Sequence, residues 1–99
     1  MTASVSLQGN VLQLAGVLDY RSGPALREQG SKLIAGSGER ALVVDCAAVE
    51  KSSSVGLSLL LAFTRDAKAN GKALAVRALP NDMAQIAEVC GISPLLVRD

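Results

Sequence analysis

The chain has 99 residues, a length typical of one small domain that can form a hydrophobic core without disulfides or metal. Hydrophobic residues make up 49% of the sequence and charged residues 19%, which indicates a globular fold rather than disorder. Ten basic and nine acidic residues give a net charge of +1, and only 2% of residues are aromatic. The sequence therefore offers neither a strong field for phosphate backbones nor a surface for base stacking, and we expect no nucleic-acid partner.

Membrane insertion and secretion are not expected either. No apolar stretch approaches the roughly 20 residues of a membrane-spanning helix, and the segment Met1–Ser4 lacks the basic and apolar regions of a signal peptide. We therefore expect a cytoplasmic protein. Cys46 and Cys90 lie in apolar surroundings without a CxxC spacing, and we predict that they are reduced core residues, with a redox pair as the alternative.

The first predicted elements form a β-hairpin. Val5 and Leu7 alternate with polar neighbours, as in a half-buried strand. The dipeptide Gly9-Asn10 is typical of a tight turn, and residues 11–18 continue as a second strand.

A helix and a buried strand are predicted next. Ser22 can cap a helix whose first turn tolerates Pro24 and which ends at Gly36. Residues 41–44 form an unbroken apolar run, typical of a central strand covered on both faces, and Asp45 follows at its carboxyl end. The apolar face of the helix is predicted to contain Leu26, Gly30, Leu33 and Ile34.

The second half of the chain predicts a helix over residues 54–70, a strand over residues 73–79 that stops at Pro80, and a last helix capped by Asn81 or Asp82. The element order ββαβαβα predicts an α/β fold with a mixed β-sheet and helices packed on it. The apolar stripe of the last helix is predicted to contain Met83, Ile86, Ala87 and Cys90.

Residues that commonly carry catalysis are missing. The chain has no histidine, which removes the usual general base and the commonest metal ligand at neutral pH. The loop Gly36-Ser37-Gly38 lacks the lysine of a phosphate-binding P-loop, and Lys51 is a sequence neighbour of serines rather than a placed activating base. We therefore expect no enzyme activity, no cofactor and no metal. A small enzyme that uses the serines as its catalytic groups is kept as an alternative hypothesis.

The helix that begins near Ser54 carries two apolar sides. At about 100° per residue, one side forms a core face that contains Leu57, Leu60, Leu61, Thr64 and Ala67, with Phe63 at its margin. The opposite side contains Val55, Leu59, Ala62 and Asp66, with Ser58 on its flank. This second side is either a docking surface for a partner protein or a set of ordinary surface residues, and the pattern alone leaves both interpretations open.

Three consecutive serines, Ser52–Ser54, precede this helix. Serine hydroxyls at a helix N-terminus can cap the helix or carry a phosphate. Capping within a flexible loop is the simpler interpretation, and we expect Ser54 to cap the helix. A phosphate on Ser54 would add roughly −1.5 to −2 charge and act as a switch without catalysis.

The element order and the serine motif resemble the STAS family, small domains named for sulfate transporters and anti-sigma-factor antagonists. The segment Leu42-Val43-Val44-Asp45 is similar to the family's strand ending in Asp, and Ser53-Ser54-Val55-Gly56-Leu57 is similar to its helix-opening motif Asp-Ser-Ser-Gly-Leu. Residues 14–19 are similar to its Gly-x-Leu-Asp strand end. The resemblance implies a single STAS-like domain over residues 1–99, with the family's phosphorylatable Ser or Thr at Ser54.

Within the family, residues 56–61 and 67–72 look most like the stand-alone STAS subunits of ABC transporters that move phospholipids between the membranes of Gram-negative bacteria. The resemblance implies a non-enzymatic accessory subunit, peripheral to the inner membrane, that binds the transporter's ATPase subunit and through it the permease complex. With the second apolar side of the helix, it predicts these partner-binding residues: Ser52, Ser53, Ser54, Val55, Ser58, Leu59, Ala62 and Asp66.

The motif departs from the family at two positions. Ser53 stands where the family usually has Asp, and Val55 replaces a small Ser or Gly. Both changes favour a constitutive protein contact over a phosphorylation switch. The alternative hypothesis is an anti-sigma-factor antagonist regulated by phosphorylation of Ser54.

Overall fold

The computed structural model describes residues 3–92 and Leu96. Within these residues the predicted order ββαβαβα is confirmed. The elements are β1 (Ser4–Gln8), β2 (Val11–Leu18), α1 (Gly23–Gly36), β3 (Ala41–Ser52), α2 (Ser54–Ala69), β4 (Ala73–Arg77) and α3 (Asn81–Val89). The sequence also has a short apolar segment at residues 92–97 after the last predicted helix, and most of this segment lies outside the described part of the chain.

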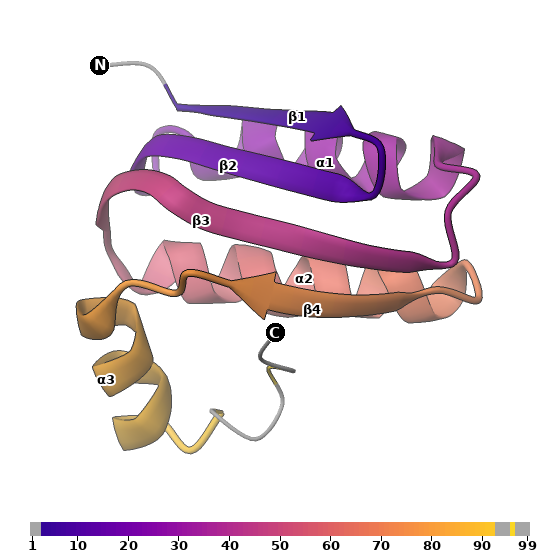
Figure 1. Ribbon diagram of the computed structural model, residues 1–99. Helices are drawn as coiled ribbons and strands as arrows, with labels where there is room; N and C mark the ends of the chain where they lie inside the picture. The colour runs from indigo at the N-terminus through magenta and orange to yellow at the C-terminus, as the bar shows by residue number, and fades with distance from the viewer. Residues whose placement is uncertain (1–2, 93–95, 97–99) are drawn as a thin grey trace.

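The four strands form one mixed sheet in the order β1-β2-β3-β4 (Figure 1). β1 pairs antiparallel with β2, whereas β2, β3 and β4 are parallel neighbours. Each parallel crossover moves one strand further in the same direction, and crossovers of this kind are right-handed. The helices α1 and α2 therefore lie side by side behind the same face of the sheet (Figure 1).

The expectation that residues 41–44 are covered on both faces was wrong. Leu42 and Val44 face the helices and are buried, but Val43 is only half-buried and Ala41 is exposed. Because both crossover helices lie on one face, no helix of the described residues covers the other face. The apolar run therefore reflects a central strand with one covered face and one face of small apolar side chains.

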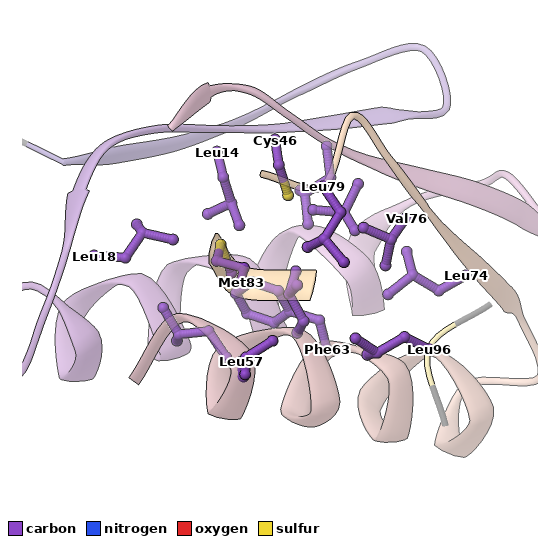
Figure 2. Close-up of a cluster of buried hydrophobic side chains, with 14 of the residues drawn as sticks. Leu14, Leu18, Cys46, Leu57, Phe63, Leu74, Val76, Leu79, Met83 and Leu96 are labelled. Carbon is purple, nitrogen blue, oxygen red and sulfur yellow. The ribbon is translucent and has the colours of Figure 1, made fainter. Parts of the chain in front are cut away.

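The core lies between the sheet and the two helices α1 and α2, and α3 closes it at one end. Alternate residues of each strand point to the helix face, as the period of two requires. Figure 2 shows Leu14, Leu18 and Cys46 of the sheet facing Leu57 and Phe63 of α2. Side chains with 0% exposure come from both layers: Leu12, Leu14, Leu18, Ile34, Val44, Leu60, Phe63, Ala67 and Met83.

β3 is longer than the sequence predicted, because two irregularities let it continue past Asp45. The register against β2 shifts between Gln13 and Ala15 and again between Gly16 and Val17. At the first shift, Oδ1 of Asp45 accepts a hydrogen bond from the Ala47 amide at 2.9 Å. Asp45 therefore stabilises a bulge within the strand, and the strand carries the chain on to Ser52.

The carboxyl ends of β2, β3 and β4 lie at one edge of the sheet, as parallel strands require. The same edge holds the first residues of α1, α2 and α3, at the left of Figure 1. The three serines therefore lie beside the turn that follows Leu18. This edge is where a parallel α/β sheet usually presents its binding site.

Helices α1 and α2 approach each other closely because α1 presents glycines to α2. A Cβ on Gly30 would overlap the ring of Phe63, and a Cβ on Gly23 would come within 2.9 Å of Cγ1 of Val55. Both glycines are buried. The prediction that placed Gly30 on the inner face of α1 is confirmed, and its missing side chain sets the distance between the helices.

Several predicted helix ends and core positions need correction. Ser22 occupies the N-cap position of α1 but makes no capping bond, because its Oγ donates to the Val17 carbonyl at 2.9 Å. The N-cap residue of α3 is Pro80, so neither Asn81 nor Asp82 occupies that position, although Oδ1 of Asp82 accepts a hydrogen bond from the Met83 amide of the first turn at 2.9 Å. Cys90, which was predicted to be a core residue on the apolar stripe of α3, is exposed to solvent, because it follows the last residue of the helix. Within the described residues, no helix is long and apolar enough to cross a membrane.

The contact between Gly30 and Phe63 predicts a stability difference between two alanine substitutions in α1. Gly30→Ala should destabilise the fold by about 1 to 3 kcal/mol, because the buried ring has no room to move away. Gly36→Ala is the matched control, since a Cβ there meets nothing within 4 Å. Its effect should be neutral or stabilising by up to about 1 kcal/mol, the helix propensity gained. Urea unfolding measures both changes, and equal stabilities for the two variants would contradict this packing.

The two cysteines should react very differently with a thiol reagent. Both are free, but Cys46 is buried and Cys90 is exposed. Burial, with a smaller contribution from the nearby Asp45 carboxylate, raises the pKa of the Cys46 thiol to about 11. At about pH 8, where an ordinary thiol is partly ionised, one thiol per chain should react rapidly with Ellman's reagent and the second only after unfolding. Cys90→Ser should remove the rapid phase, and two rapid thiols in the native protein would refute the burial of Cys46.

Candidate partner-binding site

The loop before α2 is fixed by Ser53 rather than by Ser54. Ser53 is the N-cap residue, and its Oγ accepts a hydrogen bond from the Val55 amide at 3.2 Å. The Ser53 amide also donates to the Leu18 carbonyl at 3.0 Å, which ties the loop to the end of β2. The expectation that Ser54 caps the helix was therefore wrong by one residue. The capping serine is the one that replaces the family's usual Asp, and both residue types suit this position.

Ser52 and Gly56 pack the start of α2 against the rest of the fold. Ser52 is half-buried, and its Oγ donates to the Ser53 carbonyl at 2.8 Å. A Cβ on Gly56 would overlap this hydroxyl and would lie 3.0 Å from Cε of Met83 in α3. The glycine of the motif therefore allows the loop and α3 to approach the helix closely.

Ser54 differs from Ser53 in having no role within the fold. Both serines are exposed, but Ser54 is the first residue of α2 and its hydroxyl bonds to none of the described residues. One turn later, Ser58 is also exposed, and its Oγ donates to the Ser54 carbonyl at 3.4 Å. The structure thus presents Ser54 and Ser58 on the outer side of the first two turns of α2.

The second apolar side of α2 is not an exposed stripe. Leu59 is 4% exposed and Ala62 is 7% exposed, because this side packs against α1. Val55 is half-buried beside Gly23. The helix therefore packs against α1 on this side as well as against the sheet and α3, and the expectation that these apolar residues lie at the surface was wrong for Leu59 and Ala62.

Asp66 is also engaged within the fold. Its carboxylate receives two hydrogen bonds from the Arg27 guanidinium of α1, with distances of 2.6 Å from Nη1 and 3.3 Å from Nη2. This paired geometry joins the outer edges of the two helices. Asp66 can reach a partner only as part of this ion pair.

A shallow groove of about 410 Å³ runs between α1 and α2. The expected residues Leu59 and Ala62 form part of its floor, whereas Val55 and Ser58 line the end near the serine loop. Tyr20 and Arg65 were not among the predicted residues, because the pattern of one helix cannot show which residues a second helix brings beside it. The complete lining is Tyr20, Gly23, Pro24, Arg27, Val55, Ser58, Leu59, Ala62 and Arg65.

A smaller cavity of about 270 Å³ lies at the carboxyl ends of β2 and β3. Asp19 and Lys51 line it together with Ser52 and Ser53. Oδ1 of Asp19 is occupied by the amides of Arg21 and Ser22, at 2.9 Å and 3.2 Å. In the described part of the chain, no group of three or more His, Cys, Asp or Glu residues could hold a metal ion.

The different roles of the adjacent serines predict different costs on removal. Ser53→Ala should destabilise the protein by about 1 kcal/mol, because the first turn of α2 loses its capping acceptor. Ser54→Ala is the matched control and should change stability by less than about 0.5 kcal/mol, since its hydroxyl bonds to no described residue. The free energy of unfolding in urea measures both, and a larger cost for Ser54→Ala would reverse the assignment of the cap.

The fold is similar to several solved structures. It matches the MlaB subunit in the Acinetobacter MlaFEDB complex in an ATP-bound conformation with a TM-score of 0.84 and 20% identity, covering 97% of this chain and 99% of that one. An anti-sigma factor antagonist from Mycobacterium paratuberculosis matches with a TM-score of 0.75 and 27% identity, covering 96% of this chain and 81% of that one.

The phosphorylated Bacillus cell fate determinant SpoIIAA matches with a TM-score of 0.68 and 16% identity, covering 99% of this chain and 91% of that one. These likenesses confirm the predicted STAS-like fold. A family model described as "Mlab, STAS domain" matches residues 1–98. The chain therefore belongs to the MlaB family of STAS domains.

Proposed function

We propose that the protein is a non-enzymatic accessory subunit of an ABC transporter for phospholipids, one that maintains the lipid asymmetry of the outer membrane. It binds the MlaF-like ATPase subunit, supports its assembly and activity, and reaches the permease complex through it. This contact keeps it at the inner membrane as a peripheral subunit. The family model over residues 1–98 is the observation that carries the proposal.

The contact with the ATPase centres on the first turn of α2. Ser54 and Ser58 are exposed there, and Val55 is half-buried beside them. Ser52 is half-buried and Ser53 is exposed, and both hold the loop in place through their bonds to the Ser53 and Leu18 carbonyls. Leu59 and Ala62 contribute through the groove floor, and Asp66 contributes through its pair with Arg27.

Anti-sigma-factor antagonism is the second candidate function. It is supported by the 27% identity with the mycobacterial antagonist and by the exposed hydroxyl of Ser54 at the start of a helix. A phosphate there would meet the partial positive charge of the helix N-terminus. This function requires a cognate kinase and a cycle in which Ser54 is phosphorylated and dephosphorylated.

A bulky charged side chain at position 54 should disrupt partner binding without changing the stability of the fold. Ser54→Arg should abolish recovery of the ABC ATPase in a pull-down from the native cells, because the long cation replaces an exposed hydroxyl at the contact. Ser6→Arg, an exposed site on β1, should bind normally. Both variants should keep the wild-type unfolding midpoint. Leu59→Asp is unsuitable as a probe, because a charge at a buried position would unfold the chain.

The identity of the captured proteins and the state of Ser54 decide between the two functions. Recovery of an ATPase and permease with unmodified Ser54 supports the transporter subunit. Recovery of a serine kinase, together with phosphate on Ser54 detected by mass spectrometry in any growth state, would favour the antagonist.

A further inference from the structure

The groove between α1 and α2 combines an apolar floor with a basic rim. Leu59 and Ala62 form the floor, and Pro24 adds a rigid apolar edge. The groove is open to solvent along its length instead of enclosed. Enclosed cavities suit small ligands, whereas open apolar grooves suit side chains of a peptide or helix from another protein.

The two arginines of the rim are not equivalent. Arg27 is bound to Asp66 by two hydrogen bonds, so its charge is largely compensated. Arg65 is exposed, and its guanidinium pairs with no described residue. Because Asp66 is the acid beside the groove and is already paired, Arg65 leaves the rim with an excess of positive charge.

Tyr20 extends this rim at the end of the groove near α1. Its side chain is 73% exposed, a large value for an aromatic residue. The guanidinium of Arg21 lies 5.6 Å from its ring centroid, and Nε of Arg21 donates to Tyr20 Oη at 3.2 Å. Tyrosine beside arginine is a combination typical of the residues that dominate binding energy in protein interfaces.

The groove is continuous with the contact proposed for the ATPase. Val55 and Ser58 line the groove and also belong to the first turn of α2. A partner that covers Ser54 and Ser58 would therefore reach the end of the groove without crossing another element.

We propose that this groove binds an acidic segment of the ATPase subunit, in which an apolar side chain occupies the floor and a neighbouring carboxylate pairs with Arg65. The inference rests on the proposed function, and it specifies the chemistry of the partner segment. The positive charge of Arg65 favours a segment with negative charge, and Tyr20 packs against the apolar residue of that segment.

Charge reversal in the groove tests the pairing. The complex of the full chain with its own ATPase is purified, and the dissociation constant is measured by biolayer interferometry at about 0.15 M salt, where the screening length is about 8 Å. Arg65→Glu should weaken binding about tenfold or more, because attraction becomes repulsion. The matched control Arg40→Glu changes the same charge outside the groove and should bind as wild type. Raising the salt concentration should reduce the difference in dissociation constant between wild type and Arg65→Glu.

Cross-linking identifies the segment directly. A photoreactive phenylalanine analogue at Tyr20 should cross-link to the ATPase, and the linked peptide should contain at least one Asp or Glu next to a large apolar residue. Replacing that acid with Lys should restore binding to Arg65→Glu.

The outcomes separate this inference from the proposed function. If no ATPase binds the wild-type chain, the proposed function fails. If the ATPase binds but Arg65→Glu matches wild type, or the cross-linked peptide carries no acid, the function stands and the groove proposal is overturned.

Discussion

The close approach of α1 and α2 determines which surfaces of this protein remain available. Gly30 lets the Phe63 ring fill the space between the helices, and Gly23 does the same for Val55. Because the two helices lie on one face of the sheet, this contact buries the apolar side of α2 that would otherwise face solvent. Among the described residues, the surfaces that remain exposed include the first turn of α2, the groove above the contact, and the uncovered face of the sheet.

This packing determines how the serine motif is presented to the proposed partner. Ser53 caps the helix and is tied to the end of β2, so the loop is held by hydrogen bonds from both sides. Its neighbour Ser54 is exposed, and its hydroxyl makes no hydrogen bond with any described residue. A loop fixed in this way is ordered before binding, which lowers the entropy cost of forming a complex. Such an arrangement suits a permanent subunit contact.

Much of the fold followed from local patterns in the sequence. The turn at Gly9-Asn10 and the alternation after it predicted β2 at residues 11–18, and the structure has the strand at Val11–Leu18. The start of α2 at Ser54 was also predicted, because a hydroxyl cluster precedes a leucine-rich helix. Local chemistry determines these features, so a single segment contains the information.

Features that depend on neighbouring elements were not predictable in the same way. The burial of Leu59 and Ala62 depends on α1 lying beside α2, which the pattern of α2 cannot show. Three adjacent serines are chemically identical, so only the backbone could assign the cap to Ser53. The groove residues Tyr20 and Arg65 are far apart in sequence, and only the two parallel crossovers bring them to one surface.

The proposed partner binds where the first turn of α2 meets the groove between α1 and α2. Amide hydrogen exchange, compared between the free chain and its complex with the ATPase, locates this contact. Binding there should slow exchange in residues 52–58 and 20–27 and leave residues 73–77 of β4 unchanged. Slower exchange confined to residues 11–17 and 73–77, with residues 52–58 unchanged, would place the partner on the uncovered face of the sheet and refute the proposed contact.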